Sequence, residues 1–144
     1  MNIRKANKQD WNNIAELIAK AFSKPPYKEK LKIDNVIKKL DYCGKIGEIF
    51  ISEIEGKIIG VIIIKLEYLN SGLCCFIEEL VIDEKYQRKG IGQALLETIE
   101  ILAKEKKIKF IYLTALKKAK AFEFYKKIGY KEDKETRVMS KILR

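Results

Sequence analysis

A pair of carboxylates followed by a glycine turn is the stretch of this sequence best suited to chemistry. Glu78 and Glu79 lie in an apolar segment with strand character, and Gln87 to Gly92 is a short basic turn with two glycines. An apolar helical pattern begins directly after the turn. A strand, a glycine turn and a helix in that order bring unpaired backbone N–H groups to the positive end of a helix dipole. The turn therefore predicts an anion-binding site that suits a phosphate or pyrophosphate.

The strand that precedes the turn carries two consecutive carboxylates. Two consecutive glutamates inside an apolar strand are costly if both are buried. Because successive side chains of a strand point to opposite faces, we expect one glutamate to line a cleft and the other to be wet. The alternative is that Glu78 and Glu79 are both ordinary edge or surface carboxylates.

The overall composition indicates one folded domain and narrows the chemistry available to it. The chain has 144 residues, of which 47% are hydrophobic, so we expect one domain over residues 1–144 with a substantial core. It has no histidine, the commonest general base and metal ligand. Its three cysteines form no C-x-x-C pair, so we expect buried thiols, with no metal site and no disulfide framework.

The net charge indicates the kind of partner to expect, and the hydropathy indicates the location of the protein. The formal net charge of +10 favours nucleotide cofactors, acidic substrates or nucleic acid. A nucleic-acid-binding module is the remote alternative, because the sequence has no helix-turn-helix, zinc-finger or RNA-recognition signature. No apolar run approaches the length of a membrane-spanning helix, and residues 1–5 do not resemble a signal region. We therefore expect a cytoplasmic protein without a membrane partner.

Hydrophobic periodicity predicts the elements that position these residues. The elements predicted before the turn are a strand over 2–6, helices over 8–22 and about 28–41, and strands over 48–55, 58–68 and 73–83. Tight turns join the last three strands into an antiparallel meander. The strand over 58–68 is apolar on both faces, which is typical of a central strand covered on both sides.

The second half of the chain predicts an alternation of helices and strands. The elements predicted from the turn onward are a helix over 90–106, a strand over 108–114, a helix over 118–128, and strands from 130 onward, the last over 136–143. The strands on either side of the helix over 90–106 form a βαβ unit, so we expect them to run parallel. Gly129 suits the end of the helix over 118–128.

A Gly-x-Gly pair alone is weak evidence, because most such pairs are structural turns. The dinucleotide-binding fingerprint requires a third small residue at position 95, where this chain has Leu95. The phosphate-binding P-loop pattern is absent from the sequence. These two classes of nucleotide-binding site are therefore excluded.

Two longer motifs give the glycine turn a more specific context. The residues Gln87-Arg88-Lys89-Gly90-Ile91-Gly92 match Q/R-x-x-G-x-G/A. The residues Ala121-Phe122-Glu123-Phe124-Tyr125-Lys126-Lys127-Ile128-Gly129-Tyr130 match A-x-x-F/L-Y-x-x-x-G-F/Y. In both motifs and in the order of its predicted elements, the chain resembles the GNAT-type N-acetyltransferase superfamily over essentially its whole length.

The resemblance implies a fold and a reaction. The fold is α/β (α+β) with three layers, in which a central, mixed and mostly antiparallel sheet of about six or seven strands has about four helices on its two faces. The reaction is acetyl transfer from acetyl-CoA, a co-substrate, to a primary amine, without a metal. In this family the fourth and fifth strands splay apart, and the pantetheine arm pairs with the fourth strand in the gap.

The resemblance also implies which residues hold the cofactor. Backbone amides of residues 88 and 90–93 would cradle the pyrophosphate, while Arg88 and Lys89 would add positive charge. The cofactor-binding residues implied are Leu80, Val81, Ile82, Gln87, Arg88, Lys89, Gly90, Ile91, Gly92, Gln93, Lys118, Ala121 and Phe124. One departs from the family pattern, since many members have asparagine where this chain has Lys118. Either the cofactor arm is held differently, or Lys118 contacts a phosphate or a carbonyl.

Acetyl transfer to an amine requires a base, an oxyanion donor and an acid. An alkyl ammonium must lose its proton before it can attack, and the thiolate leaving group benefits from a proton. By position, the resemblance favours Glu78 as the base, acting through a water, while Glu79 attracts a cationic substrate or pairs with a lysine. The motif match favours Tyr125 as the acid over a core aromatic. A backbone N–H near Val81 is the expected oxyanion donor.

The sequence does not identify the acceptor amine. With Glu78 and Glu79 in the cleft, we expect a small amine. A protein N-terminus or a lysine side chain is an alternative, and so is a family member that binds acetyl-CoA without transferring the acetyl group. The family often dimerises through late strands, so residues 136–143 could supply the edge of a homodimer.

Overall fold

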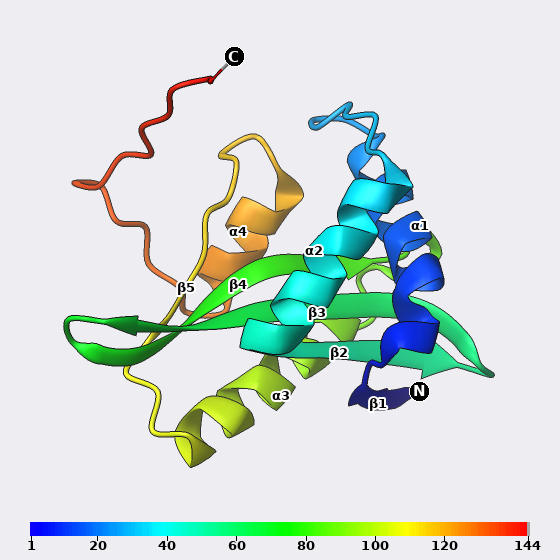
Figure 1. Cartoon of the computed structure of the whole chain (residues 1–144), viewed down its shortest axis with the longest axis horizontal. Helices are drawn as coiled ribbons and strands as arrows, with labels where there is room; N and C mark the ends of the chain where they lie inside the picture. The colour runs from blue at the N-terminus through cyan, green and yellow to red at the C-terminus, as the bar shows by residue number, and fades with distance from the viewer. Residues whose placement is uncertain (144) are drawn as a thin grey trace. The chain divides into compact units, whose positions relative to one another are not determined.

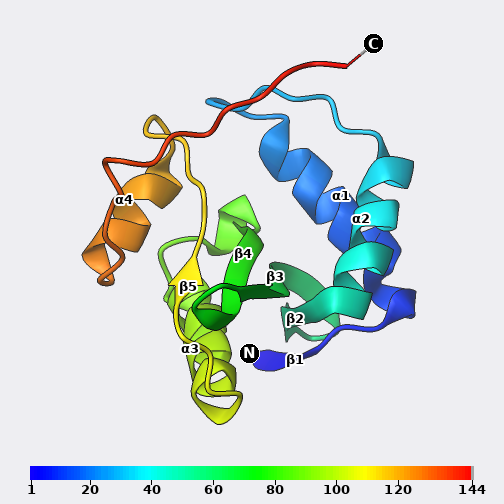
Figure 2. The same ribbon diagram turned by 60° about the vertical axis from the view of Figure 1, so that its left-hand side comes forward.

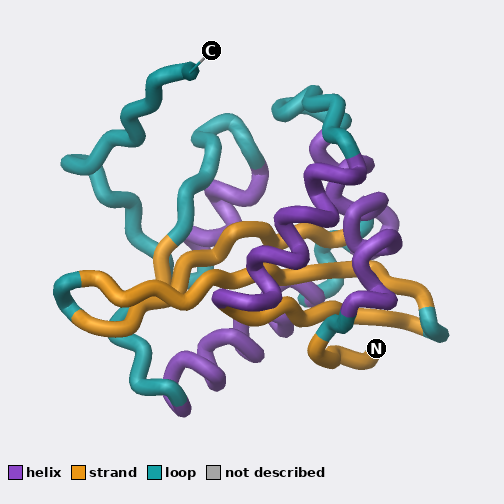
Figure 3. Tube along the Cα trace, viewed as in Figure 1, coloured by secondary structure: helices purple, strands orange, loops and turns teal. Residues whose placement is uncertain are grey.

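The computed structural model describes residues 1–143 and divides the chain into two compact units, Met1–Leu113 and Thr114–Arg144. The first unit contains a five-stranded sheet and three α-helices (Figures 1 and 3). The second unit contains one α-helix among its described residues.

The first unit is built on a mixed sheet whose strands follow the order of the chain. The strands are β1 (Asn2–Lys5), β2 (Gly47–Ile54), β3 (Lys57–Leu69), β4 (Gly72–Ile82) and β5 (Ile111–Tyr112). The first four pair antiparallel, and β5 pairs parallel to β4. The predicted meander and the predicted parallel pair are therefore confirmed, and the sheet is mostly antiparallel as expected.

The hairpin between β2 and β3 explains why these strands meet in a fixed register. Glu55 and Gly56 form its loop, and both have positive φ, at 50° and 78°. Two left-handed residues give the turn whose twist matches that of the strands it joins. Strand β3 then runs through the centre of the sheet, and Ile62, Ile63 and Ile64 are fully buried. The prediction of a central strand covered on both sides is confirmed.

Three helices cover the two faces of this sheet. Helices α1 (Trp11–Phe22) and α2 (Ile33–Ile46) lie side by side on one face, and α3 (Ile91–Glu105) lies on the other (Figure 2). A 3₁₀ turn over Lys8–Asp10 precedes α1, and Asn7 and Asp10 cap it reciprocally. The α1/α2 face contains a continuous core that includes Ile18, Leu40 and Val61.

The predicted bounds of the second helix are wrong. The sequence predicts a helix over about 28–41, but α2 begins five residues later, after Lys32, whose backbone is extended (ψ 124°). Residues 28–32 contain four charged side chains and one leucine, so they have no apolar stripe to bury. At its other end the helix continues because Cys43, only 1% exposed, extends the buried stripe. Gly44 belongs to the helix and lies against the Trp11 ring.

The predicted strand over 108–114 is shorter in the structure, where β5 spans only Ile111–Tyr112. Ile108 is still tied to the end of α3, because its N–H donates to the Ala103 carbonyl at 2.9 Å. The pairing of β5 with β4 covers just two residue pairs, Cys75 with Ile111 and Phe76 with Tyr112.

The second unit contains α4 (Lys120–Lys127), close to the predicted helix over 118–128. The strands predicted from residue 130 onward, including 136–143, are wrong, because residues 130–143 adopt no strand. The Asp133 carboxylate accepts hydrogen bonds from the N–H groups of Glu135 and Thr136, which forms a local turn there. The sheet therefore has five strands within residues 1–143, and the α/β fold class is confirmed with a lower strand count.

Crossing a membrane takes a helix both longer and more apolar than any found within residues 1–143.

Candidate active site

A β-bulge in β4 determines where the two glutamates point. Ile63 of β3 pairs with Glu79, whereas the next residue, Ile64, pairs with Ile77. Glu78 is therefore an extra residue without a partner in the register. One extra residue reverses the alternation of side chains, so two consecutive residues lie on the same face of the sheet.

Both glutamates face helix α2, on the same side of the sheet. The Lys39 ammonium of α2 donates a hydrogen bond to Glu79 at 2.6 Å and lies 3.7 Å from Glu78. The Lys65 ammonium of β3 lies 3.4 Å from the other oxygen of Glu78. The expectation that alternation sends Glu78 and Glu79 to opposite faces is therefore wrong, because it assumed a regular strand. The expectation that Glu79 pairs with a lysine is confirmed.

The two carboxylates differ in burial. The Glu79 side chain is 13% exposed, and burial raises the pKa of Glu79 above its ordinary value although the Lys39 ammonium opposes the shift. Burial alone would lower the pKa of Lys39, but the Glu79 and Glu78 carboxylates raise it overall. The Glu78 side chain is 24% exposed, and its two ion pairs are longer. Glu79 thus has one close lysine partner, whereas Glu78 is more open to exchange its partners.

Other titratable groups surround this charged cluster on the same face. Burial raises the pKa of Tyr27, from the loop after α1, and the Glu79 charge adds to that shift. Burial and the Glu78 charge raise the pKa of the Cys43 thiol on α2. The structure therefore adds two lysines, Lys39 and Lys65, that the sequence interpretation did not select. The sequence could have indicated Lys65, because alternation places it on the same, helix-facing side of β3 as Val61 and Ile63.

The glycine turn at the end of β4 has the backbone geometry of an anion site. Arg88 and Gly90 have positive φ, at 63° and 81°, and Gly90 is the N-cap of α3. The helical hydrogen-bond ladder begins with the Ala94 N–H, which donates to the Gly90 carbonyl at 3.0 Å. The N–H groups of residues 91–93 precede this ladder and point outward along the helix axis.

The surroundings of the turn leave room for a ligand. A Cβ added to Gly90 would meet nothing within 4 Å. The Gln87 side-chain amide donates to the Ile82 carbonyl at 3.1 Å, which ties the turn to the end of β4. The Lys89 ammonium lies 5.6 Å from the centre of the Tyr86 ring, so its charge stays near the turn. These residues fit a pyrophosphate through backbone N–H groups, helix polarity and nearby cations.

The edge of β4 between the bulge and the turn is open on its β5 side. The pairing with β5 stops at Phe76, two residues before Glu78, within the described part of the chain. Leu80, Val81 and Ile82 therefore keep their pairs with β3 and have no partner on the opposite edge among residues 1–143. This is the arrangement in which an extended ligand arm can pair as an additional strand.

The remaining predicted site residues belong to the second unit. Tyr125 is buried and its ring packs edge-on against Phe124 and Tyr130, both at 5.3 Å between ring centres. Ala121 and Phe124 are half-buried on α4, and Lys118 is exposed in the turn before that helix. The structure therefore divides the predicted residues into a group at 78–93 and a group at 118–125.

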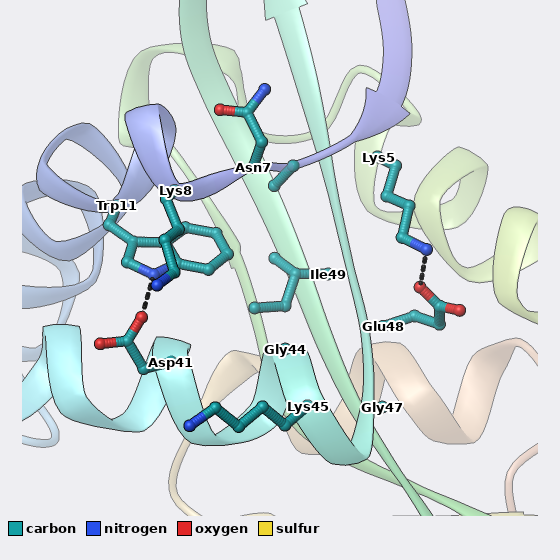
Figure 4. Close-up of a pocket in the computed structure, with 11 residues that line it drawn as sticks. Lys5, Asn7, Lys8, Trp11, Asp41, Gly44, Lys45, Gly47, Glu48 and Ile49 are labelled. Atoms are coloured by element: carbon teal, nitrogen blue, oxygen red, sulfur yellow. Dashed lines mark hydrogen bonds and ion pairs between the residues drawn. The ribbon is translucent and has the colours of Figure 1, made fainter.

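A pocket of about 240 Å³ lies elsewhere in the first unit, and none of the predicted site residues line it. Its lining residues are Lys5, Ala6, Asn7, Lys8, Trp11, Asp41, Gly44, Lys45, Gly47, Glu48 and Ile49. Figure 4 shows that two pairs of its polar side chains contact one another. The Trp11 N–H donates to Asp41 at 2.8 Å, and Lys5 lies 2.7 Å from Glu48. Within residues 1–143, no three Cys, Asp or Glu side chains come together to hold a metal.

The fold agrees with the comparisons with known proteins. The model of the acetyltransferase (GNAT) family matches residues 11–130, and the chain belongs to that family. The chain is 28% identical over 137 residues to an uncharacterized N-acetyltransferase of Methanocaldococcus jannaschii, covering 90% of this chain and 60% of the relative. The chain thus spans less than two thirds of the length of that relative.

Solved structures share the fold at low identity. A possible acetyltransferase from Clostridium difficile 630 superposes with a TM-score of 0.85 at 20% identity, covering 99% of this chain and 98% of the other. A predicted acetyltransferase from Clostridium acetobutylicum, solved with acetyl-CoA, superposes with a TM-score of 0.82 at 19% identity, covering 96% and 95%. These likenesses support the fold that the sequence predicted.

Proposed function

We propose that this chain is an acetyl-CoA-dependent N-acetyltransferase that moves an acetyl group directly to a primary amine within a ternary complex. One observation carries the proposal. A single strand, β4, joins a partly exposed carboxylate at its bulge to an open edge and an anion-binding turn at its end. A base, a slot for an extended arm and a phosphate site then follow one another along the chain. Membership of the acetyltransferase family supports the interpretation of this order as a site for acetyl transfer.

The proposed reaction assigns a task to each group. The Glu78 carboxylate, through a water, takes the proton that the acceptor ammonium must lose before it attacks. The neutral amine then forms a C–N bond to the thioester carbon, and the C–S bond breaks as the tetrahedral intermediate collapses. Tyr125 would supply the proton that the leaving thiolate takes, and the phenolate would regain a proton from the nitrogen as the amide forms. A backbone N–H near Val81 would stabilise the oxyanion.

The proposed cofactor contacts divide between side chains and backbone. The pyrophosphate would be bound by the N–H groups at 88 and 90–93, with Arg88 and Lys89 adding charge. The pantetheine arm would pair with Leu80 to Ile82 along the open edge of β4. Gln87 would hold the turn in position, and Lys118, Ala121 and Phe124 would complete the site. Acetyl-CoA supplies the activated acetyl group.

Three wider proposals accompany the reaction. The matched range, 11–130, includes residues of both compact units, so we treat them as one acetyltransferase domain. Three free, buried thiols fit a reducing, cytoplasmic location. A homodimer through residues 136–143 stays a prediction of the family resemblance.

Calorimetry with acetyl-CoA, followed by a thiol-release screen of small amines and peptides, tests the function. We expect binding below millimolar cofactor and turnover with at least one class of small amine. Turnover only with peptides would assign a protein N-terminus or a lysine side chain as the acceptor. Binding without any turnover would make the chain an acetyl-CoA-binding member, and the absence of binding would overturn the proposal.

A further inference from the structure

Four charges on the α2-facing side of the sheet form an alternating row. The row runs from Glu79 to Lys39, then to Glu78, and ends at Lys65, with separations of 2.6, 3.7 and 3.4 Å. Three elements contribute to it, since Lys39 lies on α2, Lys65 on β3 and the glutamates on β4. Two cations and two anions make the row neutral as a whole. It is therefore not an acidic pocket that attracts any amine by net charge.

The two ends of the row differ in accessibility. At one end the Glu79 carboxylate is 13% exposed and is satisfied by its hydrogen bond from Lys39. At the other end the Lys65 side chain is 27% exposed. Among residues 1–143, the only carboxylate within 4.0 Å of the Lys65 ammonium is that of Glu78. Lys65 also lies over the Phe76 ring, 4.9 Å from its centre, which restrains the ammonium beside the strand.

A simple alkylamine is a poor acceptor for this arrangement. To deliver its proton, the ammonium must approach Glu78, which already lies between the Lys39 and Lys65 ammonium groups. A third cation there meets like charges at close range in a partly desolvated site. An acceptor that also carries a carboxylate removes this conflict, because its anion pairs with Lys65 while its ammonium takes the place of Lys65 beside Glu78.

We propose that Lys65 is a specificity-determining residue and that the acceptor is an amine bearing a nearby carboxylate, as in an amino acid. The acceptor extends the alternating row by one ammonium and one carboxylate. Lys39 stays bound to Glu79 and positions the row. This inference rests on the proposed acetyl transfer, in which Glu78 receives the proton of the acceptor.

Matched acceptors test the inference. Glycine, β-alanine and 4-aminobutanoate are compared with methylamine, ethylamine and propylamine, in which hydrogen replaces the carboxylate. We expect kcat/KM to be at least about tenfold higher for the best amino acid than for its alkylamine, as an added charge-assisted pair gives. Lys65→Met should bring this ratio to within about twofold, mainly through the KM of the amino acid.

Two variants serve as controls. Lys38→Met removes an equal charge from an exposed position of α2 and should leave the acceptor ratio unchanged. Lys65→Arg keeps the cation and should retain most of the preference. Thermal unfolding of each variant shows whether it is folded, so that a lost preference is not a lost fold.

A second measurement does not depend on turnover. Backbone amide NMR signals of Lys65 and Glu78 are followed, with CoA present, as each amino acid or alkylamine is added. Turnover without any preference for amino acids would overturn the inference and leave the proposed function standing. Amide shifts with the amino acids alone, in a chain that transfers no acetyl group, would support the carboxylate subsite and overturn the transfer. Neither turnover nor shifts would overturn both.

Discussion

The bulge in β4 and the turn that follows the strand contribute to the candidate site by different means. The turn after β4 is a backbone device, in which positive φ at Arg88 and Gly90 opens helix α3 and presents N–H groups. The bulge within β4 is a side-chain device, in which Glu78 and Glu79 meet lysines from two other elements. The turn is exposed and the cluster is half-buried.

This difference decides how each region responds to substitution. A backbone site depends on conformation and free space, so a change of side-chain type has little effect unless it adds a Cβ or a charge. A partly buried charge network depends on every member, because the loss of one leaves another without its partner. Substitutions at the two regions should therefore separate binding of the cofactor from catalysis and stability.

The largest expected effect is that of Glu78→Gln, which removes the proposed base and keeps the shape of the side chain. We expect kcat to fall about 10³-fold, because general bases contribute on the order of 10²–10⁴-fold. Affinity for acetyl-CoA, measured by calorimetry, should be unchanged. Glu79→Gln is the matched control and should lower kcat by less than about fivefold. The reverse order of the two effects would make Glu79 the base.

Tyr125→Phe tests whether catalysis also needs a group outside the β4 segment. The Tyr125 ring packs against Phe124 and Tyr130, and phenylalanine keeps that packing. We expect kcat to fall about 10²-fold through loss of the phenol proton, with acetyl-CoA affinity nearly intact. Equal losses in turnover and affinity would assign Tyr125 to packing. If the phenol protonates the thiolate, the loss of kcat in Tyr125→Phe should be the same for acceptor amines of different basicity.

Lys39→Met should have the largest effect on stability. It leaves the Glu79 carboxylate, 13% exposed, without its ammonium partner, and breaking one half of a buried pair costs about 3 kcal/mol of unfolding free energy. Burial raises the folded pKa of Glu79. The stability that the protonated carboxyl of Glu79 contributes is therefore fully present below its unfolded pKa near 4.5. That contribution is lost as pH rises through the folded pKa. The deficit of Lys39→Met should therefore be larger at pH 8 than at pH 4 in urea unfolding.

Lys38→Met is the control for this measurement, because Lys38 is the exposed neighbour of Lys39 on α2. We expect it to change the unfolding free energy by less than about 0.5 kcal/mol at either pH. A deficit of Lys39→Met that equals that of Lys38→Met would show that Glu79 is solvated. The half-buried description of the cluster would then be wrong.

Gly90→Ala and Gly56→Ala form a matched pair that isolates the backbone device. Both glycines have φ near 80°, and an added Cβ meets nothing within 4 Å at either position. Alanine in this left-handed conformation costs about 1 kcal/mol of stability at both sites. Only Gly90→Ala should weaken acetyl-CoA binding, by about tenfold, because only there does the Cβ stand where a phosphate would lie. Equal affinities of the two variants would remove the turn from the cofactor site.

The turn could be predicted from the sequence because its signal is local. Glycines at the start of an apolar helical pattern predict a turn before the helix, and Glu55-Gly56 predicts the hairpin in the same way. The meander and the parallel pair around α3 also followed from periodicity and connection length. These features depend on residues that are close together in the chain.

The cluster could not be predicted because its cause is not local. A bulge shifts the register by one residue, and Glu78-Glu79 gives no local sign of which residue is the extra one. Lys39 comes from a helix forty residues before Glu79 in the chain, so their pairing could not be assigned.

A second ionic group, at the start of the chain, should respond to pH in the opposite sense and has the smallest expected effect. The Arg4 guanidinium binds Asp10 through two hydrogen bonds of 2.9 Å, and these bonds hold the pKa of Asp10 below its ordinary value of 3.8. A lowered folded pKa gives stability that is present above the unfolded pKa and is lost as pH falls through the folded one. Arg4→Met should therefore cost about 1 kcal/mol at pH 7, typical of a partly exposed pair, and almost nothing near pH 2. Urea unfolding at both pH values measures the difference. A deficit that grew toward low pH would mean that Asp10 resembles Glu79, and the opposite pH responses of the two ionic groups would be lost.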